Sequence, residues 1–294
     1  MRFRSVLVGD ELSTVAVVDE HLFAIVDEGR AVDESLGAGA LRELWAGWRP
    51  DLDSCRQVKR SVVARTAPLV RSPEKLWGIG LNYREHAGDL GEDSPLEPAS
   101  FLKGRHTLIG ADDAIIVPQG DTGTTAEAEL GLVIGSTAYC VDRSDALQFI
   151  GGVCLILDQT AETILRRNPR FLTRSKNYPT FLSVGPDLIT LDEALAPFDG
   201  ALANIVVETR LNGELVRANR VANMMFPPDY LVAFHSCLMP LYPGDVICTG
   251  TPGAVVVTPG DIAECRIPSL GQLRNLVVGA DDPIARAQIG ELLV

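Results

Sequence analysis

Short apolar segments, each closed by proline or glycine, fill most of this 294-residue chain and constrain its fold more than any other feature. From about Arg71 onward these segments have the length of strands, and apolar residues at helical spacing are uncommon. The phrase Pro-Gly-Asp followed by Val or Ile occurs twice, at 243–246 and 259–262, where it marks turns between strands. We therefore predict a mainly β fold of the α+β class.

Two short helices are predicted within this β-rich region. The first is "DRSDALQFIGG", with Asp142 or Ser144 as the N-cap, and the second is "PPDYLVAFHSCLM", which begins at Pro227–Pro228. His235 lies among the apolar residues of the second helix, so we expect it to be a packed histidine without a chemical role.

The N-terminal part of the chain has a different pattern of apolar and turn residues. Residues 3–29 alternate β-branched runs with turn residues and predict a small cluster of strands, and residues 35–48 have the apolar spacing of a helix. Pro68 and Pro73 then bracket a connecting segment. We predict a small N-terminal domain at 1–70 and a larger β-rich domain at 71–294.

Charge and cysteine usage limit the partners of the chain. Asp and Glu outnumber Lys and Arg by 39 to 26, and the resulting net charge of −13 repels nucleic acids and anionic membranes. The six cysteines form no C-x-x-C pair, and no apolar run approaches the roughly 20 residues of a membrane helix. The N-terminus also lacks the apolar core of a signal peptide. We expect a soluble cytoplasmic protein with reduced thiols.

The strongest chemical signal is "TTAEAELGLVIG", residues 124–135. Side chains two residues apart point to the same face of a strand, so Glu127 and Glu129 are expected side by side, just before the apolar run 130–134. Adjacent carboxylates that enter a protein interior require a proton, a cationic partner or a metal ion. An exposed strand with no function is the alternative interpretation of this motif.

A third carboxylate, Asp158, ends the apolar strand "GGVCLILD". If the two strands are neighbours, Glu127, Glu129 and Asp158 offer oxygen ligands of the kind that Mg²⁺, Mn²⁺ and Ca²⁺ prefer. The alternative is that Asp158 caps the helix expected after it. Lys176 is a candidate partner for the carboxylates or for a bound anion, and the turn "TGTPGA" at 249–254 offers backbone N–H groups to a carboxylate.

Taken together, these segments resemble the fumarylacetoacetate hydrolase family from about Lys75 to Val278. The motifs that carry the resemblance occur in the order of the family: "GIGLNYREH", "FLKG", "AEAELGLVIG", "LD", "RSKNYPTFLSVGP", "LNGE" and "PGDVICTGTPGA". The resemblance implies the β-rich catalytic fold of the family behind a small N-terminal domain, usually in a homodimer.

The resemblance also implies roles for individual residues. It implies metal ligands at Glu127, Glu129 and Asp158, with Mg²⁺, Mn²⁺ or Ca²⁺ as the cofactor. It implies that His86 acts as a base with Asp89, on a segment whose glycines allow it to close over the substrate, and that Lys176 is catalytic. Substrate contacts are implied at four further positions, namely Tyr83, Lys103, Gly250 and Thr251.

Several positions depart from the family pattern and leave the substrate open. Asp89 stands where glutamate is common, Glu162 where arginine is common, and Gly104 where proline follows the lysine. The glutamine that follows the "NGE" motif in the family is replaced by the stretch 216–218.

The reaction expected from the resemblance is metal-dependent hydrolysis of a carbon–carbon bond in an acylpyruvate-like or β-diketo acid, through an enolate. A decarboxylase, isomerase or dehydratase of a 2-oxo acid would use the same ligands and is the first alternative. A non-catalytic member of the family is the second. In each enzymatic case the partner is a small 2-oxo acid.

Overall fold

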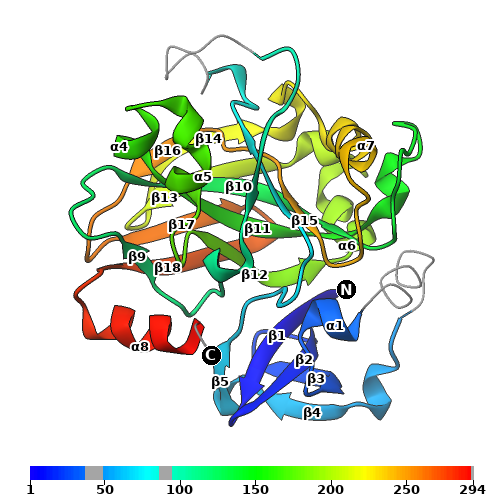
Figure 1. Ribbon diagram of the computed structural model, residues 1–294. Helices are drawn as coiled ribbons and strands as arrows, with labels where there is room; N and C mark the ends of the chain where they lie inside the picture. Colours follow the sequence, from blue (N-terminus) through cyan, green and yellow to red (C-terminus); the bar gives the residue numbers. More distant parts are fainter. Residues whose placement is uncertain (37–48, 86–94, 293–294) are drawn as a thin grey trace.

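A thirteen-stranded mixed sheet and a five-stranded sheet form the body of the protein in the computed structural model, which describes residues 1–36, 49–85 and 95–292 (Figure 1). In hydrogen-bonded order, the main path of the large sheet is β4 (Arg56–Lys59), β3 (Leu22–Glu28), β2 (Glu11–Val17), β1 (Arg2–Val8), β12 (Leu182–Ile189), β11 (Ile150–Ala161), β10 (Thr124–Ile134), β15 (Val246–Cys248), β6 (Leu76–Gly80) and β7 (Ala99–Lys103).

Three short strands extend the large sheet beside this path: β5 (Val63–Thr66) pairs with β1, β8 (Leu108–Ile109) with β12, and β16 (Ala254–Val256) with β10. The smaller sheet has the order β14 (Glu214–Arg220), β13 (Val206–Leu211), β17 (Ile262–Ile267), β18 (Gly271–Gly279) and β9 (Ile115–Val117). The α-helices within the described residues are α1 (Val32–Ser35), α4 (Glu162–Leu165), α5 (Leu172–Lys176), α6 (Leu191–Leu195), α7 (Pro228–Leu238) and α8 (Pro283–Leu292). The mainly β, α+β class predicted from the sequence is confirmed.

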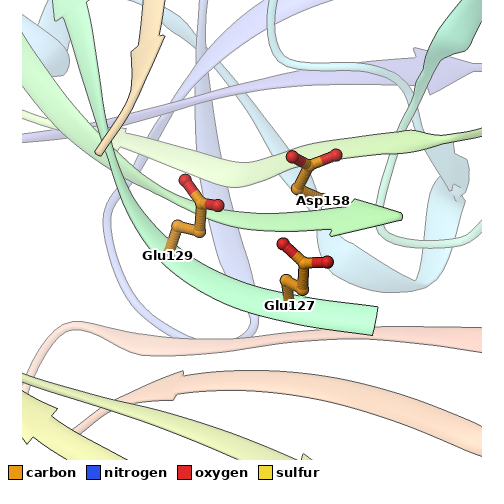
Figure 2. Close-up of side chains that lie close together, drawn as sticks. All are labelled: Glu127, Glu129 and Asp158. Carbon is orange, nitrogen blue, oxygen red and sulfur yellow. The ribbon is translucent and has the colours of Figure 1, made fainter. Parts of the chain in front are cut away.

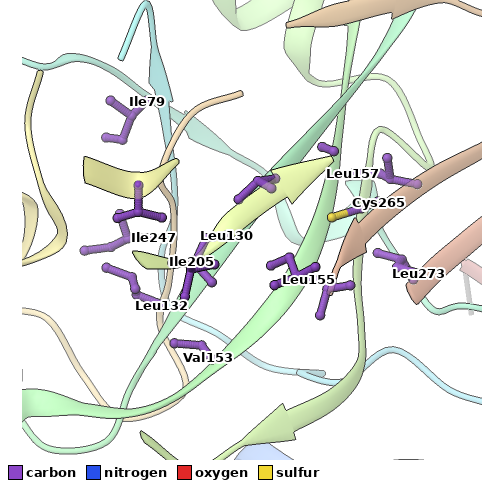
Figure 3. Close-up of a cluster of buried hydrophobic side chains, with 14 of the residues drawn as sticks. Ile79, Leu130, Leu132, Val153, Leu155, Leu157, Ile205, Ile247, Cys265 and Leu273 are labelled. Carbon is purple, nitrogen blue, oxygen red and sulfur yellow. The ribbon is translucent and has the colours of Figure 1, made fainter. Parts of the chain in front are cut away.

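The core lies between the two sheets, where β10 and β11 of the large sheet face β13, β17 and β18 of the small one. Figure 3 shows Leu155 and Leu157 of β11 in this core, close to Cys265 and Leu273. The alternate residues of β11, such as Ile156, belong to a second apolar cluster on the opposite face. Burial on both faces explains why the sequence of β11 is an almost continuous apolar run.

The expected strand cluster forms at the N-terminus, but it does not stand apart from the rest of the protein. Strand β1 pairs antiparallel with β12, with Phe3 opposite Leu188, so the N-terminal strands continue the large sheet (Figure 1). The division into domains at 1–70 and 71–294 stays a prediction.

The helices agree with the sequence analysis at one place and differ at another. The helix expected at 227–239 is confirmed as α7. The short helix expected at 142–152 forms only as a four-residue 3₁₀-helix, Ala146–Phe149, and its N-cap is Asp145 in place of the predicted Asp142 or Ser144. Strand β11 takes over at Ile150, which leaves too few residues for an α-helix. The helix expected at 35–48 falls mostly on 37–48, outside the described residues, and no described helix has the length and apolarity needed to span a membrane.

Candidate metal centre

Three carboxylates converge on one point because of the register between β10 and β11. Glu127 is directly opposite Asp158 in this antiparallel pair, and Glu129 follows two residues later on the same face of β10. One oxygen from each of the three side chains lies within 4.8 Å of the others. Figure 2 shows the carboxyl groups turned toward one another, two from one strand and one from its neighbour.

Burial makes this arrangement costly without a cation. Glu129 and Asp158 are each 1% exposed, and the Glu127 side chain is 12% exposed. Burial, reinforced by the charge of Asp158, raises the pKa of Glu129 well above its usual value. The backbone N–H of Gly250 donates a hydrogen bond to Glu129 Oε2 over 2.8 Å and partly offsets this effect.

Two buried lysines supply positive charge to the carboxylates. Lys176, the last residue of α5, places Nζ 2.7 Å from Asp158 Oδ2 and 3.2 Å from Glu127 Oε2. Lys103, the last residue of β7, contacts Asp158 Oδ1 and also donates to the carbonyl of Gln159 over 3.3 Å. Each oxygen of Asp158 therefore meets its own ammonium group.

The pKa values of the two lysines are shifted in opposite directions. Burial alone would lower the pKa of Lys176, but the carboxylates of Asp158 and Glu127 outweigh it, and the pKa is raised. For Lys103, burial and the charge of Lys176 prevail over Asp158, and the pKa is lowered. Lys176 is therefore the more permanent cation of the pair.

Two threonines that the sequence analysis did not single out complete the site. Thr160 Oγ1 donates to Glu127 Oε1 over 2.6 Å, and Thr125 Oγ1 donates to the same oxygen over 3.2 Å. Each threonine lies two residues from a carboxylate on the same strand, Thr125 before Glu127 and Thr160 after Asp158. The same period of two that predicts the carboxylate pair therefore contained the signal for both threonines.

The donor set suits a hard divalent cation. It consists of carboxylate oxygens alone, which Mg²⁺, Mn²⁺ and Ca²⁺ prefer over nitrogen or sulfur ligands. Three carboxylates and two ammonium groups leave a formal excess of one negative charge in a buried place. A divalent ion would reverse that sign, so the residues present fit such a cofactor.

The alternative role for Asp158, capping of the following helix, does not occur. The N-cap of α4 is Ala161, and no side chain caps the helix. Glu162, which stands where the family commonly has arginine, instead forms an ion pair with Arg166 one turn later, with 3.4 Å between Oε1 and Nε.

The remaining predicted residues occupy different surroundings. Thr251 is buried, and its hydroxyl bonds the carbonyl and N–H of Gly253 within its own turn. Tyr83 is fully buried, and among the described residues its hydroxyl has no hydrogen-bond partner. Burial and the nearby Glu129 raise the pKa of that hydroxyl, which keeps it a donor. His86 and Asp89 lie outside the described residues.

His235 is a packed histidine, as predicted. Its ring is fully buried, with Nδ1 2.7 Å from the Leu231 carbonyl and Nε2 2.7 Å from Ser100 Oγ. Nδ1 therefore donates to the carbonyl, and Nε2 accepts from the hydroxyl. The Nδ1 bond lies within α7, and the Nε2 bond with Ser100 holds α7 against β7.

Comparison with known proteins shows the family to which the chain is related. The family model described as "Fumarylacetoacetate (FAA) hydrolase C-terminal" matches residues 75–278. The chain is 33% identical over 228 residues to the human protein named oxaloacetate tautomerase FAHD2A, mitochondrial, a match that covers 74% of this chain and 71% of the relative.

Solved structures extend the likeness over nearly the whole fold. The 5-carboxymethyl-2-hydroxymuconate delta-isomerase of Mycobacterium smegmatis is similar with a TM-score of 0.76 and 25% identity, over 96% of this chain and 100% of the other. The maleylpyruvate hydrolase of Sphingobium sp. SYK-6, solved in complex with manganese(II) and pyruvate, shares the fold with a TM-score of 0.77 at 24% identity, over 95% of this chain and 99% of the other.

Proposed function

Because the chain belongs to the fumarylacetoacetate hydrolase family, we propose that it is a divalent-metal-dependent enzyme that hydrolyses a carbon–carbon bond in an acylpyruvate-like or β-diketo acid. The observation that carries this proposal is the buried convergence of Glu127, Glu129 and Asp158 beside Lys176. An oxygen-only cluster of this kind supports reactions that pass through the enolate of a 2-oxo acid.

Charge explains how so acidic a protein would bind an anionic substrate. The chain carries a net charge of −13, which repels a carboxylate at long range. With a divalent ion held by Glu127, Glu129 and Asp158, the three carboxylates, the two lysine ammonium groups and the ion together would carry one net positive charge. This local charge matches the single carboxylate of a 2-oxo acid.

The cation and the residues around it would make different contributions to the reaction. A bound Mg²⁺, Mn²⁺ or Ca²⁺ would supply Lewis-acid stabilisation of the enolate charge. Lys176, protonated and fixed by two carboxylates, adds positive charge beside the same place. Thr125 and Thr160 fix the orientation of Glu127 through its Oε1 atom.

Further roles belong to residues near the cluster and to residues assigned from sequence. Tyr83 supplies a buried hydroxyl, without a partner among the described residues, that would donate to the substrate, and Lys103, Gly250 and Thr251 would line the same site. In this mechanism His86, oriented by Asp89, takes the proton from the attacking water. The two fragments would then leave as a carboxylic acid and a 2-oxo acid.

A second reaction deserves testing, because a relative 33% identical to the chain is named an oxaloacetate tautomerase. Keto–enol exchange of oxaloacetate requires the same stabilised enolate but no water attack. The described residues around Glu127, Glu129 and Asp158 would serve either reaction, and the base on the His86 segment would distinguish them.

Product analysis would test the proposal. The purified protein with Mn²⁺ or Mg²⁺ is incubated with acetylpyruvate, and we expect acetate and pyruvate in equal amounts. A parallel assay with oxaloacetate follows the decay of its enol absorbance and the release of pyruvate. Enol decay without acetylpyruvate cleavage would replace the hydrolase with a tautomerase, and pyruvate release from oxaloacetate would indicate a decarboxylase.

Two variants assign the activity to the site. Glu129→Gln should abolish turnover together with metal binding, whereas His86→Ala should abolish hydrolysis while metal binding is retained. Turnover by His86→Ala at the wild-type rate would contradict the role of that base.

A further inference from the structure

Two exposed cysteines that are far apart in the sequence meet at the C-terminal end of α7. Cys237 lies in the last turn of this helix, and Cys140 is 97 positions earlier in the chain, yet their sulfur atoms are 2.7 Å apart. Atoms in ordinary packing contact sit about 3.5–4.0 Å apart, whereas the sulfurs of a disulfide are about 2.0 Å apart. The two sulfur atoms are therefore in direct contact, at a separation where one S–H can donate to the other sulfur.

Backbone hydrogen bonds hold the two cysteines in place. The N–H of Cys140 donates to the carbonyl of Ser236 over 3.1 Å, and the N–H of Val141 donates to Ser236 Oγ over 3.1 Å. A β-bridge between Ala138 and Leu241 fixes the same two segments on the other side of the pair. The fold thus holds the backbones of the two cysteines side by side.

The other cysteines of the chain lack this combination of access and partner. Cys154, Cys248 and Cys265 are buried, out of reach of a small disulfide. The hydrogen bond with Cys237 also raises the pKa of Cys140, so the exposed pair differs from the buried thiols in access and in its neighbouring sulfur. Cys55 is partly exposed, with its sulfur 3.4 Å from the Asp51 carbonyl. Among the described residues no second pair of cysteines shares a sulfur–sulfur contact.

We propose that Cys140 and Cys237 form a reversible covalent modification site that reacts with a small disulfide, such as glutathione disulfide. One thiolate attacks a sulfur of the small disulfide and releases one small thiol. The second thiolate then attacks the protein-bound sulfur, closes the Cys140–Cys237 bond and releases a second small thiol. The two cysteines lose two electrons and two protons, and the small disulfide gains them.

The bridge would enclose a segment that contains part of the metal centre. Asp158 and Lys176 both lie between Cys140 and Cys237 in the sequence. A cross-link over so long a loop restricts the unfolded chain and stabilises the folded one. Oxidation should therefore raise the melting temperature, and a reducing agent such as dithiothreitol should reverse the change.

The test uses the full-length protein, first reduced and then equilibrated with glutathione and glutathione disulfide. Intact mass should fall by two hydrogen atoms, thiol titration should lose two groups, and peptide mapping should join Cys140 to Cys237. In Cys140→Ser and in Cys237→Ser, the remaining cysteine of the pair should carry a glutathione adduct. Neither variant should show the rise in melting temperature. Cys55→Ser serves as the matched control and should oxidise as the wild type does.

The outcomes separate clearly. Joined peptides that contain Cys140 and Cys237, formed in the wild type and in Cys55→Ser, would establish the site. An unchanged thiol count, glutathione adducts without an internal cross-link, or a cross-link between other cysteines would each overturn the proposal. The wild-type mass and peptide map decide this point even if a serine variant folds poorly.

Discussion

Lys176 is the residue on which the acidic cluster depends most, because its ammonium group contacts both Glu127 and Asp158. Its replacement in Lys176→Met would leave buried carboxylates with Lys103 as the remaining ammonium group. Loss of one partner from a buried ion pair typically costs about 3–5 kcal/mol. We expect the free energy of unfolding of the metal-free variant to fall by that order, as measured by urea denaturation.

A divalent ion should restore part of that loss, since it neutralises the same carboxylates. The melting temperature of Lys176→Met should therefore rise more with Mn²⁺ than that of the wild type. Lys59→Met, at an exposed position of β4, is the matched control and should change neither quantity. Equal stability of Lys176→Met and wild type without metal would contradict the role given to this lysine.

His235 predicts a pH dependence of stability. Burial lowers the pKa of His235 below 6.5, although the hydrogen bond with Leu231 opposes this shift. The unfolded chain thus binds the proton more readily than the folded protein. The contribution of the neutral ring is complete above about pH 6.5 and is lost as the pH falls toward the folded pKa.

The measurement is the free energy of unfolding at several pH values below 6.5 for the wild type and for His235→Gln. The wild type should show an additional slope of up to about 1.4 kcal/mol per pH unit, and the variant should lack it. His106→Gln, at an exposed histidine, is the control and should keep the wild-type slope. Parallel pH profiles for His235→Gln and the wild type would rule out this assignment.

Single residues also show how far sequence reasoning extends. The period of two along a strand predicts Glu127 beside Glu129, and the structure places Glu127 opposite Asp158 with Glu129 close by on the same face. The contact between Lys103 and Asp158 was not predictable in this way, because β7 and β11 are not neighbours in the sheet. Three strands, β10, β15 and β6, separate β7 from β11 in the sheet, so no local sequence pattern contains this contact.

Among the elements, the turn after β15 is the one most tightly coupled to the metal centre. Gly250 has a φ of +93°, and a Cβ atom there would lie 2.8 Å from Asn82 Cβ and 2.9 Å from the Ile79 carbonyl oxygen. The same residue donates its N–H to Glu129. Both the backbone angle and the space around it therefore require glycine.

Gly250→Ala should consequently lose divalent-ion affinity as well as stability, because the turn must move away from Glu129. Isothermal titration with Mn²⁺ and thermal unfolding would measure the two effects. Gly260→Ala is the matched control, since Gly260 has a φ of +101° but no atom within 4 Å of its added Cβ. It should show only the backbone strain, about 1–3 kcal/mol, with unchanged ion affinity.

Elements were predicted unevenly from the sequence for a physical reason. Strand β11 and helix α7 were predicted from the sequence because each has a long apolar pattern that indicates which of its faces are buried. A longer helix was predicted for segment 142–152 because its N-cap residues favour a helix. In the structure, residues from Ile150 onward instead pair with β10 as part of β11. Sheet pairing acts over distances that a local pattern does not contain.

At the scale of the whole molecule, the metal centre should make folding depend on divalent ions. A ligand that binds only the folded state at 100 times its Kd adds about 2.7 kcal/mol of stability. We expect Mn²⁺ to raise the melting temperature of the wild type, and the affinity to increase with pH because Glu129 must lose its proton. Differential scanning fluorimetry across metal concentrations would measure both effects.

Glu129→Gln removes one carboxylate and should abolish this metal-dependent rise. Glu28→Gln, at a half-exposed position in β3, preserves the cluster and should respond as the wild type does. If the melting temperature of the wild type is unchanged by Mg²⁺, by Mn²⁺ and by Ca²⁺, the basis for a metal-dependent reaction is removed.

The pairing of β1 with β12 has a consequence for any attempt to divide this protein. A fragment that starts at residue 71 would leave the β1 side of β12 with unpaired backbone groups from Asp187 to Ile189, a template for self-association. Such a fragment should aggregate when produced alone and recover when residues 1–70 are co-expressed as a separate peptide, which light scattering would detect. The chain is thus a candidate for split-protein complementation, with its own first strand as the missing piece.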